Sequence, residues 1–205
     1  MVFSAFLDTC VLYPSRLRDV LLELACQGAY RAVWSDGVEE ELARVLERNY
    51  SHKKTIGDDN NTDLRNDRSI YINRLLDQMN LALPDAKVCI KDSPTSFSIE
   101  SLPDPNDMHI VAGALAGRAD VIVTFNLNDF PKTCLPFSLF AQDPDEFLID
   151  LLDLNPNLVK IALRNVANRT GKKGPKLEEQ DILIHLGNLS NVKGFATQAH
   201  TILYG

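Results

Sequence analysis

The sequence Val-Ile-Val-Thr at residues 121–124 is short and almost wholly apolar. Such a run is typical of a β-strand that is buried on both faces, as the strands of a parallel sheet are. Comparable runs lie at 3–7 and 31–34, with apolar residues at helical spacing between the runs. Because strands and helices alternate, the sequence predicts a doubly wound parallel α/β sheet. In such a sheet the ligand site lies beyond the carboxyl ends of the strands.

Two further strands and several helices complete the predicted α/β region. The runs at 87–90 and 135–140 indicate the strands. The polar stretch 51–67 is expected to be a mobile connection, and the proline-containing stretch 91–106 is expected to be a loop. Apolar residues at helical spacing predict helices over about 17–24, 38–46, 70–79 and 106–115.

After residue 143 the pattern becomes helical. No strand candidate of comparable strength follows, and Gly171–Pro175 interrupts this region. We therefore expect an α/β domain over residues 1–142 and an α-helical C-terminal extension over residues 143–205. The helices of the extension are predicted over Pro144–Leu154, Asn155–Val166, Leu177–Leu186 and Leu189–Leu203.

The composition is that of an ordinary globular protein, with 45% hydrophobic and 24% charged residues. No apolar run approaches the roughly 20 residues that a membrane span needs, so no membrane association is expected. The apolar start lacks a basic region and reaches a charge at Asp8, which favours a strand over a signal peptide. The four cysteines are scattered, which is typical of free thiols in a reducing cytoplasm.

The formal net charge of −7 makes the chain a poor nonspecific binder of nucleic acid. One segment departs from this average. Residues 158–176 carry six lysines and arginines and no acidic residue. Such a basic strip either binds phosphates on an otherwise acidic protein or is simply a solvated helix face and loop.

Four acidic residues stand where a parallel sheet presents its site. Asp8 ends one predicted strand, Glu41 lies inside a predicted helix and Asp107 opens another. Asn126 and Asp129 follow the apolar run at 121–123. Carboxylates so widely spaced converge only if the sheet brings them together, and converging carboxylates repel unless a cation holds them. The pattern predicts a site for Mg²⁺ or Mn²⁺, which prefer oxygen ligands.

Each of these residues also has an ordinary structural explanation. Asp8 and Asp129 could be turn residues, Glu41 a solvated helix residue and Asp107 a helix N-cap. Taken together, the order of these residues along the chain favours a catalytic site over these structural explanations. No histidine pair has zinc-ligand spacing, and the chain contains no G-x-S-x-G elbow, Walker A loop or G-x-G-x-x-G sequence.

This joint order resembles the pattern of the PIN-domain ribonucleases, and in particular of the VapC-type toxins of bacterial toxin–antitoxin pairs. Phe-Leu-Asp-Thr-Cys at 6–10 is similar to the opening strand with its first metal-binding Asp, although Cys10 stands where Asn is common. Residues 35–46 are similar to the second motif, whose frame selects Glu41 over the two glutamates before it.

The third and fourth motifs complete the resemblance. Asp107 followed by Val-Ala-Gly-Ala at 111–114 matches the third motif, and Val-Thr-Phe-Asn at 123–126 with Asp129 matches the fourth. Each motif alone is weak, but four in order at the usual spacing are specific. The resemblance covers roughly residues 1–140.

The resemblance implies a three-layer α/β/α PIN-like domain with a central parallel sheet, followed by the helical extension. It also implies a Mg²⁺- or Mn²⁺-dependent site that cleaves RNA internally. In this site Asn126 and Asp129 orient the water that attacks the phosphate. The metal ligands would be Asp8, Glu41, Asp107 and Asp129.

Two departures from the family pattern leave alternatives open. Asn126 stands where some members have Asp, so the carboxylate at the fourth motif would be Asp129, with a metal contact that can run through water. Asp104 is an alternative to Asp107 as the third acid, although the helical register favours Asp107. A subset of VapC-like proteins is similar in carrying a helical extension, whose role does not follow from the resemblance.

As a toxin, the protein would have RNA as substrate and a cognate antitoxin protein as partner, and a homodimer stays open. The alternative is a catalytically silent PIN-fold module that binds RNA or protein; metal-dependent cleavage separates the two. A small-phosphoester hydrolase on another α/β fold is less favoured, because Asp8-Thr9-Cys10 lacks the second Asp of a D-x-D motif.

Overall fold

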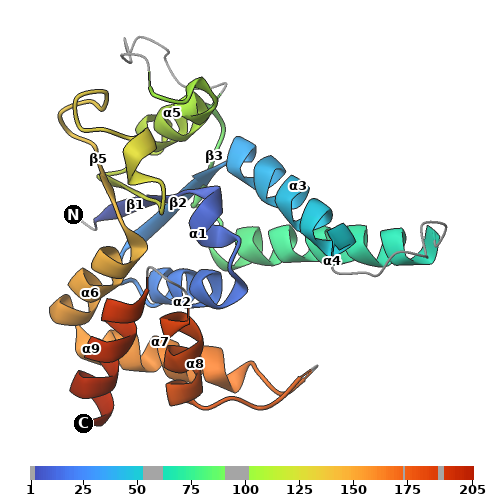
Figure 1. The fold of residues 1–205 in the computed structure, drawn as a ribbon, viewed down its shortest axis with the longest axis vertical. Coiled ribbons are helices and arrows are strands. Elements are labelled where there is room, and N and C mark those ends of the chain that lie inside the picture. Colours follow the sequence, from blue (N-terminus) through green and yellow to red (C-terminus); the bar gives the residue numbers. More distant parts are fainter. Residues whose placement is uncertain (1–2, 53–61, 91–101, 173, 189–191) are drawn as a thin grey trace.

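The computed structural model describes residues 3–52, 62–90, 102–172, 174–188 and 192–205. At its centre is a sheet of five parallel strands in the order β3-β2-β1-β4-β5 (Figure 1). The strands are β1 (Ser4–Leu7), β2 (Arg31–Ser35), β3 (Lys87–Val88), β4 (Val121–Val123) and β5 (Phe140–Gln142). The predicted parallel α/β sheet is confirmed.

The sheet changes direction of winding at β1. From β1 the chain adds β2 and β3 on one side, and later adds β4 and β5 on the other. β1 therefore pairs with both β2 and β4, through Phe6↔Val33 and Phe6↔Ile122. Side chains just beyond the carboxyl ends of β1 and β4 consequently lie beside a topological switch point, where ligands of such folds bind.

Helices cover both faces of the sheet and make the α/β/α sandwich that the sequence predicted. α5 (Met108–Ala116) packs on one face against β1, β2 and β4, and α2 (Ser15–Cys26) covers the other face (Figure 1). α5 comes close because Gly113 has no side chain. A Cβ at this position would lie 2.7 Å from the ring of Phe6, which is fully buried in β1.

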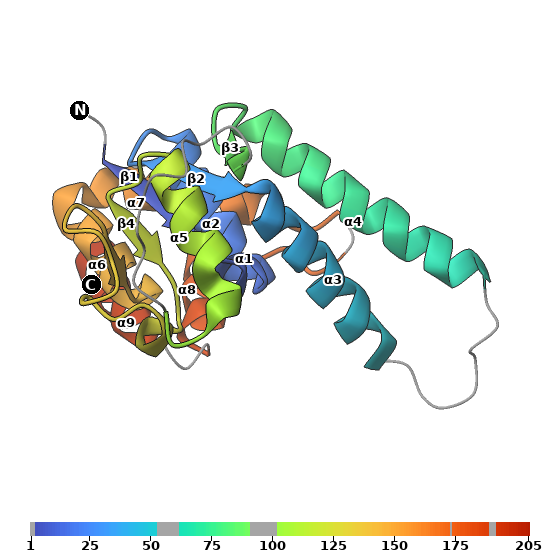
Figure 2. The same cartoon turned by 90° about the horizontal axis from the view of Figure 1, so that it is seen from above.

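α3 (Asp36–His52) and α4 (Thr62–Ala82) form a pair that projects away from the sheet (Figure 2). α3 starts next to β2, where the Ser35 hydroxyl accepts a hydrogen bond from the Val38 amide at 3.3 Å. The connection expected over 51–67 is therefore shorter, because helix persists at both of its ends. Residues 53–61 and 91–101, also expected to be loops, lie outside the described residues.

The C-terminal region is helical, as predicted, and packs against α2 on the side away from the sheet (Figure 1). Its buried apolar residues continue the core of the sheet domain; Phe147, for example, meets Tyr30 edge-on with ring centroids 5.0 Å apart. The helices are α6 (Pro144–Leu154), α7 (Pro156–Asn168), α8 (Glu179–Gly187) and α9 (Lys193–Tyr204).

The strand predicted at 135–140 is the main error. β5 begins only at Phe140, and the preceding residues turn at Pro131 and Pro136. Proline has no amide to donate to a ladder, so this segment instead buries single leucines, Leu135 and Leu139, under the sheet edge. Among the described residues, no helix is both long and apolar enough to cross a membrane.

Candidate active site

Asp8 is fixed at the carboxyl end of β1. Its amide donates to the Val123 carbonyl at 3.2 Å, which extends the β1–β4 ladder by one residue. Its carboxylate is buried, and Oδ2 accepts hydrogen bonds from the Thr124 hydroxyl at 2.6 Å and the Cys10 thiol at 3.0 Å. Oδ1 has no hydrogen-bond partner within the part of the chain that the structure describes, so it is free to bind a ligand.

The side chains of Thr124 and Cys10 both hold Oδ2 of Asp8, and we call this pair the Thr124–Cys10 clamp. No role was predicted for either residue from the sequence. Their side chains contact each other at 3.4 Å, and the Phe125 amide donates to the Cys10 sulfur at 3.3 Å. Burial raises the pKa of the Cys10 thiol, and the charge of Asp8 raises it further. The thiol therefore stays protonated and acts as a donor to Asp8.

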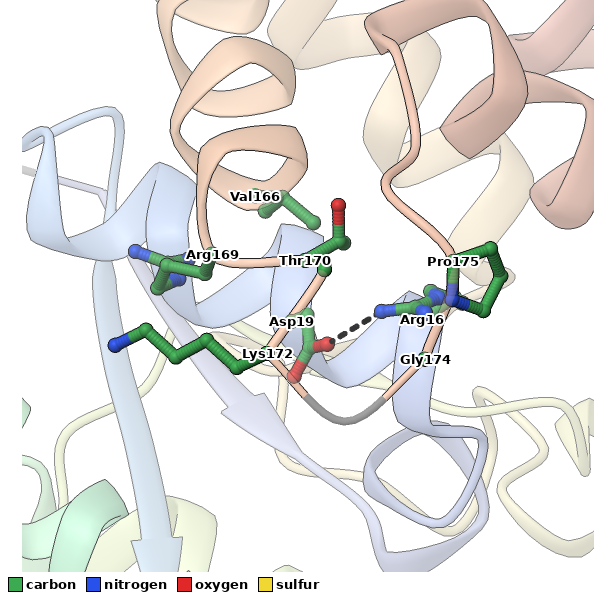
Figure 3. Close-up of a pocket in the computed structure, with 9 residues that line it drawn as sticks. Arg16, Asp19, Val166, Arg169, Thr170, Lys172, Gly174 and Pro175 are labelled. Atoms are coloured by element: carbon green, nitrogen blue, oxygen red, sulfur yellow. Dashed lines mark hydrogen bonds and ion pairs between the residues drawn. The ribbon is translucent and has the colours of Figure 1, made fainter.

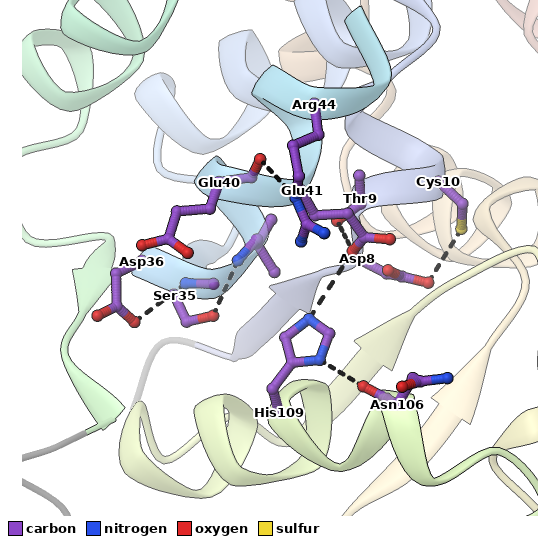
Figure 4. A network of polar contacts seen from close by, with 12 residues as sticks. Asp8, Thr9, Cys10, Ser35, Asp36, Glu40, Glu41, Arg44, Asn106 and His109 are labelled. Atoms are coloured by element: carbon purple, nitrogen blue, oxygen red, sulfur yellow. Dashed lines mark hydrogen bonds and ion pairs between the residues drawn. The ribbon is translucent and has the colours of Figure 1, made fainter. Parts of the chain in front are cut away.

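Glu41 reaches the site from α3, which starts at the carboxyl end of β2. Its Oε2 accepts a hydrogen bond from the Thr9 hydroxyl at 2.7 Å, one residue from Asp8 (Figure 4). The same oxygen lies 3.7 Å from Nε2 of His109, whose Nδ1 is 2.7 Å from the Asn106 carbonyl. His109 was also missed from the sequence, although it follows Asp107 by only two residues.

The neighbouring glutamates have other surroundings. Glu39 is buried and accepts hydrogen bonds from Trp34 Nε1 at 2.9 Å, Asn80 Nδ2 at 2.8 Å and Lys87 Nζ at 2.6 Å. Glu40 is exposed. Glu39 thus ties α3 to β2, β3 and α4, and of these three consecutive glutamates it is Glu41 whose carboxylate contacts the loop that carries Asp8.

Asp107 stands at the start of α5, where the short helix η2 (Pro105–Asp107) ends. The pKa of Asp107 is raised to about 6, chiefly by burial and further by the negative charges of Asp8, Asp129 and Asp104, against the opposing effect of His109. These aspartates are therefore close enough to repel one another.

The alternative third acid, Asp104, has a structural role. Its Oδ1 accepts a hydrogen bond from the Asn106 amide at 2.9 Å and caps η2. Asp129 ends the short helix η3 (Leu127–Asp129) and is partly exposed, whereas Asn126 precedes η3 and is exposed. Asn126 and Asp129 thus follow β4 toward the rim of the acidic site.

Within the described ranges, no group of three or more His, Cys, Asp or Glu side chains is placed to hold a metal ion. The chemistry of the donor set nevertheless fits a hard cation. The carboxylates of Asp8, Asp107 and Asp129 could supply oxygen ligands, and the charges of Asp8 and Asp129 add to the effect of burial in raising the pKa of Asp107. Binding a divalent cation between them would remove this repulsion.

Comparisons with known proteins agree with this geometry. Residues 4–128 match the PIN domain, and residues 144–201 match the VapC50 C-terminal domain. A relative from Mycobacterium tuberculosis (strain ATCC 25618 / H37Rv), named "Putative ribonuclease VapC50", is 45% identical over 58 residues, which are 28% of this chain and 34% of the relative. The chain thus matches about a third of that relative's length. No solved structure shows a significant match. The chain belongs to the PIN-domain family and carries a C-terminal domain of the VapC50 type.

Proposed function

We propose that this protein is a metal-dependent endoribonuclease, and that it acts as the toxin of a toxin–antitoxin pair. The observation that carries the proposal is geometric: at the carboxyl edge of a PIN fold, Glu41 is held by Thr9, the residue that follows Asp8. The charges of Asp8 and Asp129 also contribute, after burial, to the raised pKa of Asp107. Crowded carboxylates are unfavourable in a stable fold, so their presence at a ligand-binding edge favours a function that needs them.

In this proposal Asp8, Glu41, Asp107 and Asp129 hold Mg²⁺ or Mn²⁺. When bound, the ion supplies an activated water and neutralises the charge that develops on the attacked phosphate. The chain's own contribution is orientation. The Thr124–Cys10 clamp fixes one oxygen of Asp8 and leaves the other for the ligand.

Other side chains would position Glu41 and the substrate. The Thr9 hydroxyl holds Glu41 toward the site, and His109, when protonated, can donate from Nε2 to the same carboxylate oxygen. Asn126 is exposed at the rim, where its amide can hydrogen-bond the attacking water or a phosphate oxygen. Metal contacts through Asp129 can run through water.

The toxin role rests on the relative's printed name, a ribonuclease, and on the matching C-terminal domain. It implies an RNA substrate in the cytoplasm and an antitoxin that silences the enzyme. The domain division proposed with it is a PIN nuclease domain over 1–142 and a helical extension over 143–205. The rival function, a silent RNA- or protein-binding module, does not require acidic residues at this edge of the sheet.

Expression in bacteria tests the proposal. We expect induction of the wild-type chain to stop growth and fragment total RNA, and the Asp8→Asn chain, at equal abundance, to do neither. Equal growth arrest by both chains with intact RNA would contradict the nuclease and favour the binding module. Co-expression of the neighbouring open reading frame, if it encodes an antitoxin, should restore growth.

A further inference from the structure

A cavity of about 490 Å³ lies between α2 and the loop that follows α7 (Figure 3). Three of the described residues that line it are cations: Arg16, Arg169 and Lys172. Its lining includes one carboxylate, Asp19. A positive cavity on a chain of net charge −7 points to an anionic ligand.

The fold builds this cavity from the sheet domain and the C-terminal extension together. α7 packs along α2, and Glu23 of α2 accepts hydrogen bonds from Asn165 Nδ2 at 2.7 Å and Arg169 Nη1 at 2.5 Å. The loop then folds back on itself, since the Leu177 amide donates to the Thr170 hydroxyl at 2.9 Å. The side chains of Arg169 and Lys172 are thereby presented from a braced loop.

The basic strip predicted over 158–176 is not one continuous surface. Lys160 donates to the Leu203 carbonyl at 3.0 Å, Arg164 pairs with Glu179 at 2.8 Å and Lys176 donates to the Ala167 carbonyl at 2.9 Å. These three cations hold the extension together. Lys173 lies outside the described residues. Of the other cations in the strip, Arg169 pairs with Glu23 through Nη1 and lines the cavity with its remaining N–H groups, and Lys172 lines the cavity as well. The fold adds Arg16 from a distant part of the sequence.

The cations in the cavity keep donors for a ligand. Arg16 contacts Asp19 only through Nη1, at 3.5 Å, and Arg169 contacts Glu23 only through Nη1. Each guanidinium has further N–H groups, and the two side chains are 35% and 57% exposed. Lys172 has no polar partner in the described part of the chain. Guanidinium and ammonium groups with open donors are the usual ligands of phosphate.

The cavity lies at the same edge of the sheet as the acidic site. α1 (Thr9–Leu12) follows Asp8 directly, and Arg16 is in the first turn of α2. α2 must return from the carboxyl end of β1 to the amino end of β2, because the two strands are parallel. Its first turn is therefore at the carboxyl edge, and Figures 1 and 2 both show the loop after α7 projecting on the side of α1.

We propose that this cavity binds backbone phosphates of the RNA substrate, separate from the phosphate that is cleaved. The inference rests on the proposed ribonuclease function. The acidic site repels RNA until its cation is bound, so a separate cationic contact on the same edge would hold the strand in place. The C-terminal extension would thus be part of the substrate-binding surface.

The test measures how a single-stranded RNA of about 20 nucleotides, fluorescently labelled, binds across a salt series in a cleavage-deficient Asp8→Asn background. One variant adds Arg16→Gln and Lys172→Gln. The matched control adds Arg118→Gln and Lys193→Gln, which remove the same charge at exposed positions, one at the amino end of β4 and one on α9. Thermal melts check that both variants fold.

We expect the cavity variant to bind RNA on the order of tenfold more weakly at 0.1 M salt, and its slope of log affinity against log salt to be shallower by about 1.4, or roughly 0.7 for each lost contact with a single strand. The control should keep the parent slope. If the Arg16→Gln variant does not fold, the single substitution Lys172→Glu replaces it, because Lys172 is exposed. We expect Lys172→Glu by itself to lower both the RNA affinity and the salt slope.

Equal slopes for the cavity variant and the control would overturn the proposal. Binding of poly-glutamate, an acidic polypeptide, is measured on the same variants. If the cavity variant loses this binding and keeps its RNA binding, the proposal is also overturned, and the cavity is assigned to an acidic protein segment. The proposed function is judged separately, from RNA cleavage by the chain with Asp8 intact. If that chain cleaves RNA and the cavity variant behaves like the control, only the phosphate site is wrong.

Discussion

At the scale of single residues, the site depends on contacts that hold carboxylates in place. Asp8 keeps one oxygen bound to the Thr124–Cys10 clamp, and Glu41 is held by Thr9. Neither arrangement could be read from the sequence. The clamp requires β1 and β4 to be neighbours although they are more than 110 residues apart, and the contact between Thr9 and Glu41 requires β1 to pair with β2. The acids themselves could be picked out as candidates, since Asp8 and Asp107 stand at the ends of recognisable elements and Glu41 lies inside a recognisable helix.

Replacing Thr124 with Val removes the shorter hydrogen bond to Asp8 and keeps the side-chain volume. We expect RNA cleavage to fall about 10- to 100-fold, as when the orienting partner of a metal ligand is lost. Single-turnover cleavage across a metal titration measures the effect. Cys10→Ser retains a donor near Asp8 and should lose much less; equal losses for both variants would show that the hydrogen bond to Asp8 is not what matters.

Glu39 and Glu41 should separate stability from activity. Glu39→Gln weakens a buried network of three donors and should lower the free energy of unfolding by about 1–3 kcal/mol. Glu41→Gln should leave that free energy nearly unchanged and lose RNA cleavage. Urea denaturation and a cleavage assay on both variants measure this. If Glu41→Gln lowered the free energy of unfolding and Glu39→Gln did not, the assignment of stability to Glu39 and of activity to Glu41 would be wrong.

The raised pKa of Asp107 predicts a pH dependence in the presence of chelator. The pKa is about 6 in the folded chain against 3.8 for an unperturbed Asp, so the folded state binds this proton more tightly. The free energy of unfolding should therefore fall as pH rises from about 4 to 6. The effect should be on the order of 1 kcal/mol, because solvent screens a partly exposed carboxylate.

Asp107→Asn should remove this part of the pH dependence and make the metal-free protein more stable at pH 7. Mg²⁺ or Mn²⁺ should stabilise the wild type at pH 7 more than at pH 5, because protonated carboxylates bind cations weakly. Thermal melts in chelator and in each metal measure both effects. A pH profile that Asp107→Asn leaves unchanged would show that this carboxyl is not the titrating group.

At the scale of elements, close packing of α5 on the sheet positions Asp107. Gly113→Ala would place a Cβ 2.7 Å from the Phe6 ring and should lower the free energy of unfolding by about 1–3 kcal/mol. Gly174→Ala is the control, because nothing lies within 4 Å of its added Cβ. Urea denaturation compares them. Equal stability of both variants would mean that α5 can shift without penalty.

Element types were more predictable than element ends. The strands at 4–7, 31–35 and 121–123 were recognisable because they are apolar and buried on both faces. The segment 135–139 is also largely apolar but does not form a strand, since Pro136 has no amide to donate to a ladder and the Leu139 amide turns back to the Pro136 carbonyl. The helices α3 and α4 extend into polar sequence, where periodicity gives no signal.

At the scale of the whole molecule, the extension and the sheet domain share one core, and Glu23 links them through Asn165 and Arg169. The sequence predicted that the extension is helical, but it could not show which cations hold it together and which remain free. That division depends on partners beyond the basic strip: Glu23, far before it in the sequence, pairs with Arg169, and Glu179, just after it, pairs with Arg164.

The most direct test of the central claim is cleavage of a labelled single-stranded RNA by the purified chain. We expect cleavage in Mg²⁺ or Mn²⁺, none in EDTA, and a loss of about a hundredfold or more in Asp8→Asn. Glu40→Gln, an exposed neighbour of Glu41, should cleave like the wild type. Cleavage that persists in EDTA, or that Asp8→Asn performs as fast as the wild type, would contradict a metal-dependent ribonuclease centred on Asp8.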